Sequence, residues 1–180
     1  MSQLLVEILS EEEVQRLIAH PDAADIFGLR DAAILSVLYY AAATAAEVTT
    51  LNIADIDWND GILRLRPDLG RPRRVLIEEP LAAMLNHYLE ESRKPLLAHG
   101  GGMDAGALRP VFVTNKGHRV GVQDIRQILG AHGKGAGVEA SVNYNTLRLS
   151  RAWHLREAGE SPEKIQRMLG ASGRSGRRLV

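Results

Sequence analysis

The stretch NYNTLRLSRAWHLREAGESPEKIQRMLG, residues 143–170, is typical of two short helices joined by a tight corner. The Asn143 side chain can cap the first helix by accepting backbone N–H groups, and Ala158-Gly159 favours a left-handed end. Ser161-Pro162 has the residue types that start a second helix, and Gly170 would end it. The apolar face of the first helix is expected to comprise Leu147, Ala152, Trp153 and Leu155.

The residues before this unit predict helices packed around one small antiparallel sheet. Ser10-Glu11-Glu12-Glu13 is a capping box at a helix start, and the almost wholly apolar run 28–46 predicts a buried central helix. Asn59-Asp60-Gly61 is a strong turn between the run 54–58 and a strand at 62–66. A second turn, at 67–72, leads into a third strand at 73–77. Further helices are expected at 45–52, 80–93 and 122–131, with a short strand at 111–113. The predicted fold class is therefore α+β, mainly α.

Length and composition favour one ordinary globular domain over residues 1–180, with a flexible basic tail at 171–180. No run is long and apolar enough to span a membrane, and the N-terminal residues lack the pattern of a secretory signal. The chain has no cysteine, which excludes disulfides and thiolate chemistry. These features predict a cytoplasmic location, at the nucleoid if the protein binds DNA.

The net charge of zero conceals a division along the chain. Residues 1–108 carry 9 Lys and Arg against 17 Asp and Glu, whereas residues 109–180 carry 13 against 5. A basic C-terminal part is what a phosphate backbone would attract. The alternative is that the two parts neutralise each other inside the fold, and charge alone does not separate the two explanations.

In order and spacing, these segments resemble the catalytic domain of the tyrosine recombinases, the phage integrase family. The family's His-x-x-Arg box is matched by Asn145-Thr146-Leu147-Arg148, and its Leu-Gly-His by Leu169-Gly170-Ala171. Tyr39 through Leu51 corresponds to the segment usually written Gly-Leu-Arg-x-Ser-Glu-Leu. The resemblance implies helices around a three-stranded sheet, and it covers nearly the whole chain. The separate N-terminal DNA-clamping domain of most members is expected to be absent.

The family chemistry implied by this resemblance is DNA strand transfer through a phosphotyrosyl bond, without metal or other cofactor. Two arginines and a histidine stabilise the phosphate oxygens, and a lysine on the turn between the second and third strands acts as general acid. Retained family positions are Glu47 and Arg148. Substituted positions are Thr44 (first arginine), Asp68 (lysine), Asn145 (first histidine), Ala171 (second histidine) and Val180 (nucleophile). The resemblance therefore predicts a catalytically incomplete domain.

Binding to double-stranded DNA through its backbone is the first hypothesis for what remains. The basic residues expected to face the phosphates are Arg66, Arg71, Arg73, Arg74, Lys116, Arg119, Arg148 and Arg151. Such binding should weaken steeply with salt. Another copy of the chain, or another recombinase subunit, is a further expected partner.

Two alternatives stay open from the sequence. One is an active recombinase whose nucleophile comes from a partner chain; of the tyrosines present, Tyr144 is the least implausible substitute, although a packing role is favoured. The other is a structural or partner-binding relic without DNA affinity. A metal enzyme is not expected, because the six histidines lack metal-ligand spacing. His154 is interpreted as a helix-surface residue or a hydrogen-bonded core residue.

Overall fold

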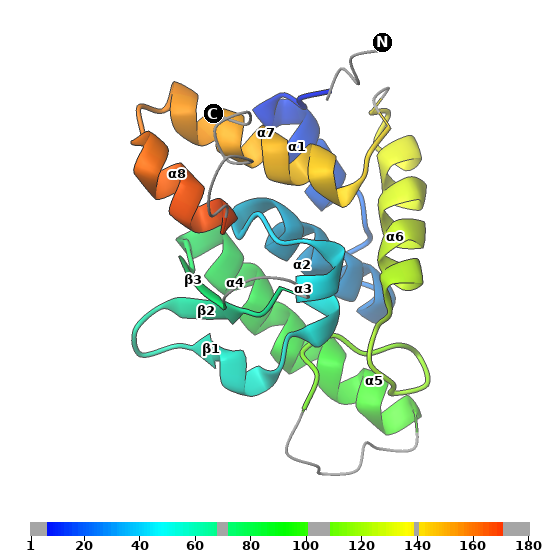
Figure 1. Ribbon diagram of the computed structural model, residues 1–180. Helices are drawn as coiled ribbons and strands as arrows, with labels where there is room; N and C mark the ends of the chain where they lie inside the picture. The colour runs from blue at the N-terminus through cyan, green and yellow to red at the C-terminus, as the bar shows by residue number, and fades with distance from the viewer. Residues whose placement is uncertain (1–6, 68–71, 101–108, 139–140, 171–180) are drawn as a thin grey trace.

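Eight α-helices and a three-stranded antiparallel sheet make up the described part of the chain, residues 7–67, 72–100, 109–138 and 141–170 of a computed structural model. Helix α2 (Ile26–Tyr40) runs through the centre, with the sheet on one side and α6 (Val122–Gly135) along the opposite edge (Figure 1). The predicted fold class is confirmed.

Helix α2 forms the core because its residues 32–39 are buried on every side. Ten of its fifteen residues are buried, and a helix of this kind is stable only when neighbours cover every side. Its neighbours include α1 (Glu11–Ala19), α4 (Glu79–His87) and α7 (Tyr144–Glu157). The predicted capping box is present at the start of α1, where the Ser10 hydroxyl accepts from the backbone N–H of Glu13.

The end of α2 differs from the prediction. The apolar run predicts a helix to residue 46, but α2 ends at Tyr40, and Ala42 has a left-handed φ of 46°. An L-residue pays a steric penalty there because Cβ approaches the following carbonyl oxygen. A separate helix, α3 (Ala45–Thr50), starts beyond this break.

The sheet is a meander of β1 (Ile56–Asp57), β2 (Ile62–Leu65) and β3 (Arg73–Leu76), in that spatial order. A 3-10 turn, η1 (Ile53–Asp55), precedes it. The predicted turn before β2 is confirmed, with Gly61 at a φ of 62°. Side chains alternate between the two faces of β3, so that Arg73 and Val75 are buried and their neighbours are exposed.

The helix predicted at 80–93 extends further than expected. After α4, the π-helical segment η2 (Tyr88–Arg93) continues directly into α5 (Lys94–His99). The Tyr88 hydroxyl donates to the carbonyl oxygen of Val111 at 3.0 Å. The strand predicted at 111–113 is wrong: this segment forms one isolated bridge, from Val113 to Arg119.

Helix α6 continues past its predicted end at 131 to Gly135. Glycines weaken a helix when they are exposed, but a Cβ at Gly133 would come within 2.9 Å of the Val142 side chain. Close packing of α6 on the following segment therefore requires a glycine at this position.

The two-helix unit predicted at 143–170 is confirmed as α7 and α8 (Pro162–Leu169). Asn143 caps α7 and Gly170 ends α8 at a φ of 65°. One detail is wrong: Trp153 lies on the exposed side of α7 and is 46% exposed. His154 takes its place in the interior, bonded to the Tyr39 hydroxyl at 2.7 Å and the Leu9 carbonyl oxygen at 2.9 Å, so the core interpretation of this histidine is confirmed.

Candidate nucleic-acid interface

Glu47 and Arg73 form a buried ion pair close to the break between α2 and α3. Arg73 Nε and Nη2 donate to the two carboxylate oxygens of Glu47, each at 2.8 Å. Thr44 is the N-cap of α3, and its hydroxyl accepts from the backbone N–H of Glu47, whose carboxylate accepts in return from the Thr44 N–H. Thr44, which the sequence analysis aligns with the first arginine of the family, is thus a helix cap, and its capping box holds Glu47 in place.

Arg148 reaches the same place from α7. Its Nη1 donates to the carbonyl oxygen of Ala42 at 2.5 Å, and its Nη2 donates to the carbonyl oxygen of Leu169. Arg73 also donates to Ala42, at 3.0 Å, so two guanidinium groups share one carbonyl oxygen. We call Glu47, Arg73 and Arg148 the arginine cluster.

The arginine cluster neutralises the ends of two helices. Besides Ala42, Arg73 donates to the carbonyl oxygens of Ala41 and Met168. These carbonyl groups, with that of Leu169, lie at the C-termini of α2 and α8, where the helix dipole leaves partial negative charge. Side chains of arginine commonly satisfy such carbonyl groups.

Burial and neighbouring charges shift the pKa of the Glu47 carboxyl group and of the Arg148 guanidinium group. Burial alone would raise the pKa of Glu47, but the hydrogen bonds and charge of Arg73 outweigh burial and lower that pKa. Burial, together with the neighbouring charge of Arg73, lowers the pKa of Arg148 to about 10. The cluster therefore keeps a carboxylate ionised and places two cations close together, which is favourable only because carbonyl groups and Glu47 surround them.

Arg73 and Arg148 differ in how many of their N–H groups have no hydrogen-bond partner among the described residues. A guanidinium carries five N–H groups. Arg73 makes five hydrogen bonds within the cluster and its carbonyl partners and is nearly completely buried. Arg148 makes two among the described residues and is half-buried. Within that part of the chain, Arg148 keeps N–H groups without a partner, whereas every N–H group of Arg73 is used inside the fold in this conformation.

Asn145 lies one turn before Arg148 and is exposed at the start of α7. Its backbone N–H donates to the capping side chain of Asn143 at 2.9 Å. The structure therefore brings together Thr44, Glu47, Arg148 and the helix that carries Asn145. Asp68, Arg71, Ala171 and Val180 lie outside the described residues.

Two further predicted DNA contacts are used inside the fold. Arg119 donates to the carbonyl oxygens of Thr49 and Leu51 and to the Asn52 side chain. Arg151 is 9% exposed and pairs with Glu78. Both residues tie elements together. Arg151 is buried and paired, whereas Arg119 is half-buried and keeps two N–H groups without a partner among the described residues.

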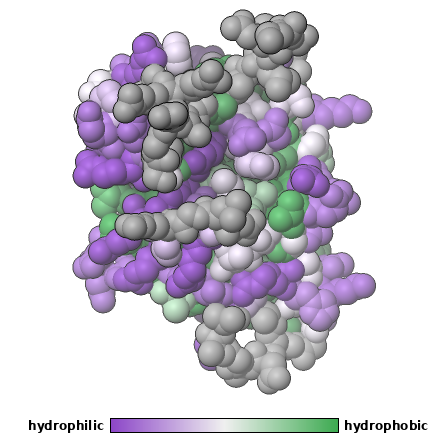
Figure 2. All heavy atoms as spheres, in the orientation of Figure 1, coloured by the Kyte–Doolittle hydropathy of each residue, from purple (hydrophilic) through white to green (hydrophobic). Residues whose placement is uncertain are grey.

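The remaining predicted contacts are exposed. The Arg66 side chain is 52% exposed beside Asp55, and that of Arg74 is 62% exposed, with Asp60 at 3.7 Å. Lys116 is exposed in the turn that follows Thr114. Hydrophilic residues cover most of the described surface on the face in Figure 2.

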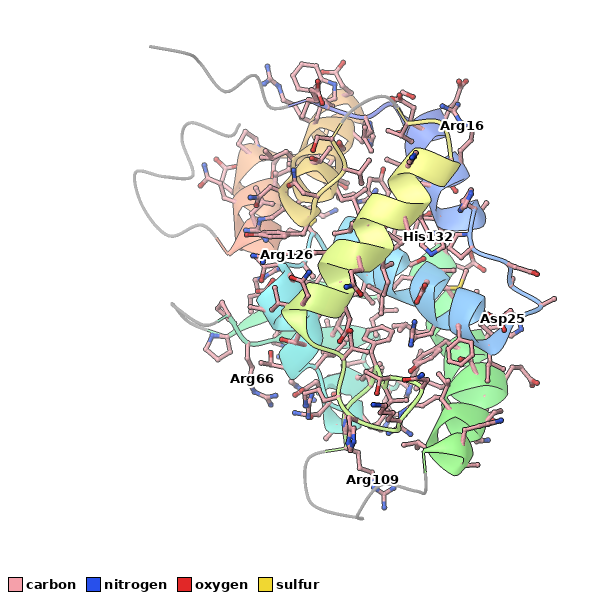
Figure 3. All side chains as sticks on the ribbon, turned by 90° about the vertical axis from the view of Figure 1, so that its right-hand side faces the viewer. Arg16, Asp25, Arg66, Arg109, Arg126 and His132 are labelled. Atoms are coloured by element: carbon pink, nitrogen blue, oxygen red, sulfur yellow. The ribbon has the colours of Figure 1, made fainter. Side chains whose placement is uncertain are left out.

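Arg126 is an exposed cation that the sequence analysis missed. It lies on α6, and Figure 3 shows it on the same side of the molecule as Arg66, with Arg16 on the opposite side. Its position could have been predicted, because Ile125, Ile128 and Leu129 define the buried face of this helix and residue 126 falls outside it.

No set of three or more His, Cys, Asp or Glu residues in the described ranges is arranged to hold a metal ion. None of the helices seen there is long and apolar enough to cross a membrane.

Comparison with known proteins identifies relatives along almost the whole chain. A sequence model described as "Phage integrase family" matches residues 7–174. Tyrosine recombinase XerC of Syntrophus aciditrophicus is 32% identical over 163 residues, which cover 91% of this chain and 52% of that protein. Tyrosine recombinase XerD of Lacticaseibacillus casei is 33% identical over 171 residues, covering 95% and 56%. The chain thus spans about half the length of these relatives.

Solved structures show the same architecture. The crystal structure of XerA recombinase superposes with a TM-score of 0.78 at 28% identity, covering 96% of this chain and 59% of that one. The Tn1549 transposon integrase in complex with transposon right-end DNA gives a TM-score of 0.79 at 14% identity, covering 99% and 61%. The second similarity is one of fold alone.

Proposed function

Because the chain belongs to the phage integrase family of tyrosine recombinases, we propose that it is a recombination-related domain that binds duplex DNA by its phosphates but does not cut it. The observation that carries this proposal is the contrast within the arginine cluster. Arg148 has three N–H groups without a partner among the described residues, whereas Thr44, which the resemblance aligns with the first arginine, serves as a helix cap.

The exposed cations support a backbone-directed mode of binding. Arg66, Arg74, Lys116 and Arg126 are exposed, and one of them, Arg66, shares a side of the molecule with Arg126 (Figure 3). Contacts to phosphate fix the position of a protein on DNA without reading its sequence. The proposed domain would therefore add affinity for DNA without selecting a target sequence. Its proposed location is the nucleoid in the cytoplasm.

The proposal is tested by fluorescence anisotropy with a short labelled duplex at several salt concentrations. Four phosphate contacts, from Arg66, Arg74, Lys116 and Arg148, predict a log–log salt slope of about −3.6 and roughly a 100-fold loss of affinity between 50 and 200 mM salt. The double variant Arg66→Ala/Lys116→Ala should reduce the slope by about 2. Lys94→Ala is the control, because the Lys94 side chain is 65% exposed and is not among the predicted phosphate contacts. Absence of binding, or a slope unchanged in the double variant, would reject the proposal in favour of a structural relic.

The absence of cleavage is tested separately with a suicide duplex, on which a covalent protein–DNA adduct accumulates. Tyr144, the substitute nucleophile considered from the sequence, is half-buried and packs against the core. We expect no adduct from the chain alone or mixed with a full-length recombinase lacking its own nucleophile. An adduct in either reaction would identify the domain as part of an active enzyme.

A further inference from the structure

Two histidines far apart in the sequence share a hydrogen bond. His20, at the end of α1, and His132, on α6, place their Nδ1 atoms 3.0 Å apart. The other ring nitrogen of His132, Nε2, lies 3.1 Å from Asp31 Oδ2 on α2. The relay His20–His132–Asp31 thus connects three separate elements.

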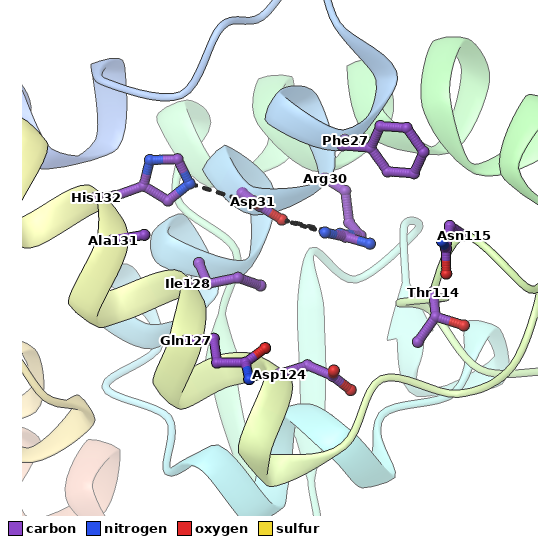
Figure 4. Close-up of a pocket in the computed structure, with 10 residues that line it drawn as sticks. All are labelled: Phe27, Arg30, Asp31, Thr114, Asn115, Asp124, Gln127, Ile128, Ala131 and His132. Carbon is purple, nitrogen blue, oxygen red and sulfur yellow. Dashed lines mark hydrogen bonds and ion pairs between the residues drawn. The ribbon is translucent and has the colours of Figure 1, made fainter.

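Figure 4 shows Asp31 between Arg30 and His132 at the wall of a cavity of about 520 Å³. Arg30 binds the carboxylate through Nη2 at 2.8 Å and through Nε at 2.9 Å. A carboxylate held by arginine remains ionised and can only accept hydrogen bonds. Asp31 therefore assigns the direction of every hydrogen bond in the relay.

The assignment runs outward from Asp31. His132 Nε2 must carry a hydrogen in order to donate to Asp31, so in the neutral ring Nδ1 is an acceptor. His20 Nδ1 must then carry the hydrogen that lies between the two rings. Carboxylates commonly fix the tautomer of a histidine in this way, by accepting from one of its ring nitrogens.

The relay accepts one additional proton but not two. The first can bind at His20 Nε2, which takes no part in the relay, and every hydrogen bond is retained. The second must bind at His132 Nδ1, where a hydrogen from His20 already points. Two N–H groups would then face each other across 3.0 Å, and two cationic rings would repel each other.

Neighbouring charges do not remove this conflict. Asp31 is shared with Arg30, and Asp22 accepts from the backbone N–H of Ala24. Arg16 is exposed one turn before His20 on α1, and residues one turn apart are neighbours on a helix. Its charge opposes a second positive charge on the pair.

Breaking the hydrogen bond between His20 and His132 also affects α6, because His20 packs against this helix. A Cβ at Gly135 would lie 2.3 Å from His20 Nε2, so the imidazole packs directly on the backbone of the last turn of the helix. A His20 ring that separates from His132 must also leave this contact.

We propose that His20 and His132 form a proton-operated latch, which holds the C-terminal half of α6 to the end of α1 at neutral pH and releases it when both rings are protonated. Two protonated rings cannot keep the hydrogen bond between their Nδ1 atoms, whereas the unfolded chain carries no such restriction. Stability therefore falls as pH falls. This inference is independent of DNA binding.

The test compares thermal unfolding of the wild type, His20→Asn and His20→Ala between pH 7.5 and 5.0. The asparagine amide occupies the place of Nδ1 and can donate to His132 or accept from it, but it gains no charge. At pH 7.5 the wild type and His20→Asn should unfold about 2–4 °C above His20→Ala. At pH 5.0 the wild type should fall to the level of His20→Ala, while His20→Asn keeps its margin.

Parallel pH profiles for the wild type and His20→Asn would overturn the proposal, as would a His20→Ala variant that matches the wild type at pH 7.5. Amide hydrogen exchange gives a second readout on the wild type alone. After correction for intrinsic rates, residues 129–135 should lose protection at pH 5.0 relative to α4. His118→Ala is the matched control, because His118 is exposed, and its profile should follow that of the wild type.

Discussion

The arginine cluster and the exposed cations have the same side-chain chemistry but opposite surroundings. Arg73 and Arg74 are neighbours in β3, yet the first side chain is 6% exposed and the second is 62% exposed. One neutralises Glu47 and the ends of two helices, and the other points into solvent. A count of basic residues therefore overestimates the charge that a domain can offer to DNA, because part of it is used to hold the fold.

The largest difference between the two regions should appear in stability. Arg73→Ala leaves Glu47 buried without its partner and several carbonyl groups without donors, so we expect a loss of about 3–5 kcal/mol in the free energy of unfolding. Arg74→Ala should cost less than about 0.5 kcal/mol. Urea denaturation at pH 7.5 measures both. Equal losses of unfolding free energy in the two variants would show that the buried Arg73 contributes no more to stability than the exposed Arg74.

A smaller effect should appear in acid. The pKa of Glu47 is lowered in the folded state, so its ion pair contributes stability above the ordinary carboxyl value of ~4.3, and that contribution is lost as pH falls through the lowered pKa. Glu47→Gln should cost about 2–3 kcal/mol at pH 7, with the gap to the wild type closing below pH ~4. Denaturation curves at pH 7, 5 and 3 measure this gap, and a constant gap would contradict the ion-pair account.

The smallest effect concerns the backbone of the cluster. Ala42 has a left-handed φ, which costs an L-residue about 1–2 kcal/mol, whereas glycine reaches it freely. Because glycine also loses more entropy on folding, Ala42→Gly should stabilise the protein by about 0.5–1 kcal/mol. The control is Ala43→Gly, at a buried residue without a positive φ, and it should destabilise. Stabilisation by both changes, or by neither, would argue against strain at Ala42.

Local rules predicted much of the fold. The capping box of Ser10, the cap at Asn143 and the glycine stop at Gly170 were read correctly because each depends on a few neighbouring residues. The break after Tyr40 was missed, since alanine is a strong helix former and nothing local marks its left-handed φ. That conformation is stabilised by Arg73 and Arg148, whose donors reach the Ala42 carbonyl from elements far along the chain.

The site was less predictable than the fold. The alternation of β3 could have indicated that Arg73 faces inward, because Val75 shares its face. The roles of Arg119 and Arg151 depend on tertiary partners, as does the pairing of His20 with His132 across 112 positions, and no sequence spacing reports those contacts. The family positions of Glu47 and Arg148 came from resemblance, and the structure places both in one cluster; their roles in binding DNA stay predictions.

The π-helical segment Tyr88–Arg93 limits how the length of this chain can change. A residue inserted into a helix turns everything after it by about 100°. The π-helical turn is already one residue wider than an α-helical turn, so it can lose a residue by becoming α-helical but has no room for another. An insertion within it would carry Leu96, which is completely buried, away from the core, whereas an insertion in the turn at 58–61 would only lengthen a connection. Insertions should therefore be tolerated between the strands and selected against at 88–93.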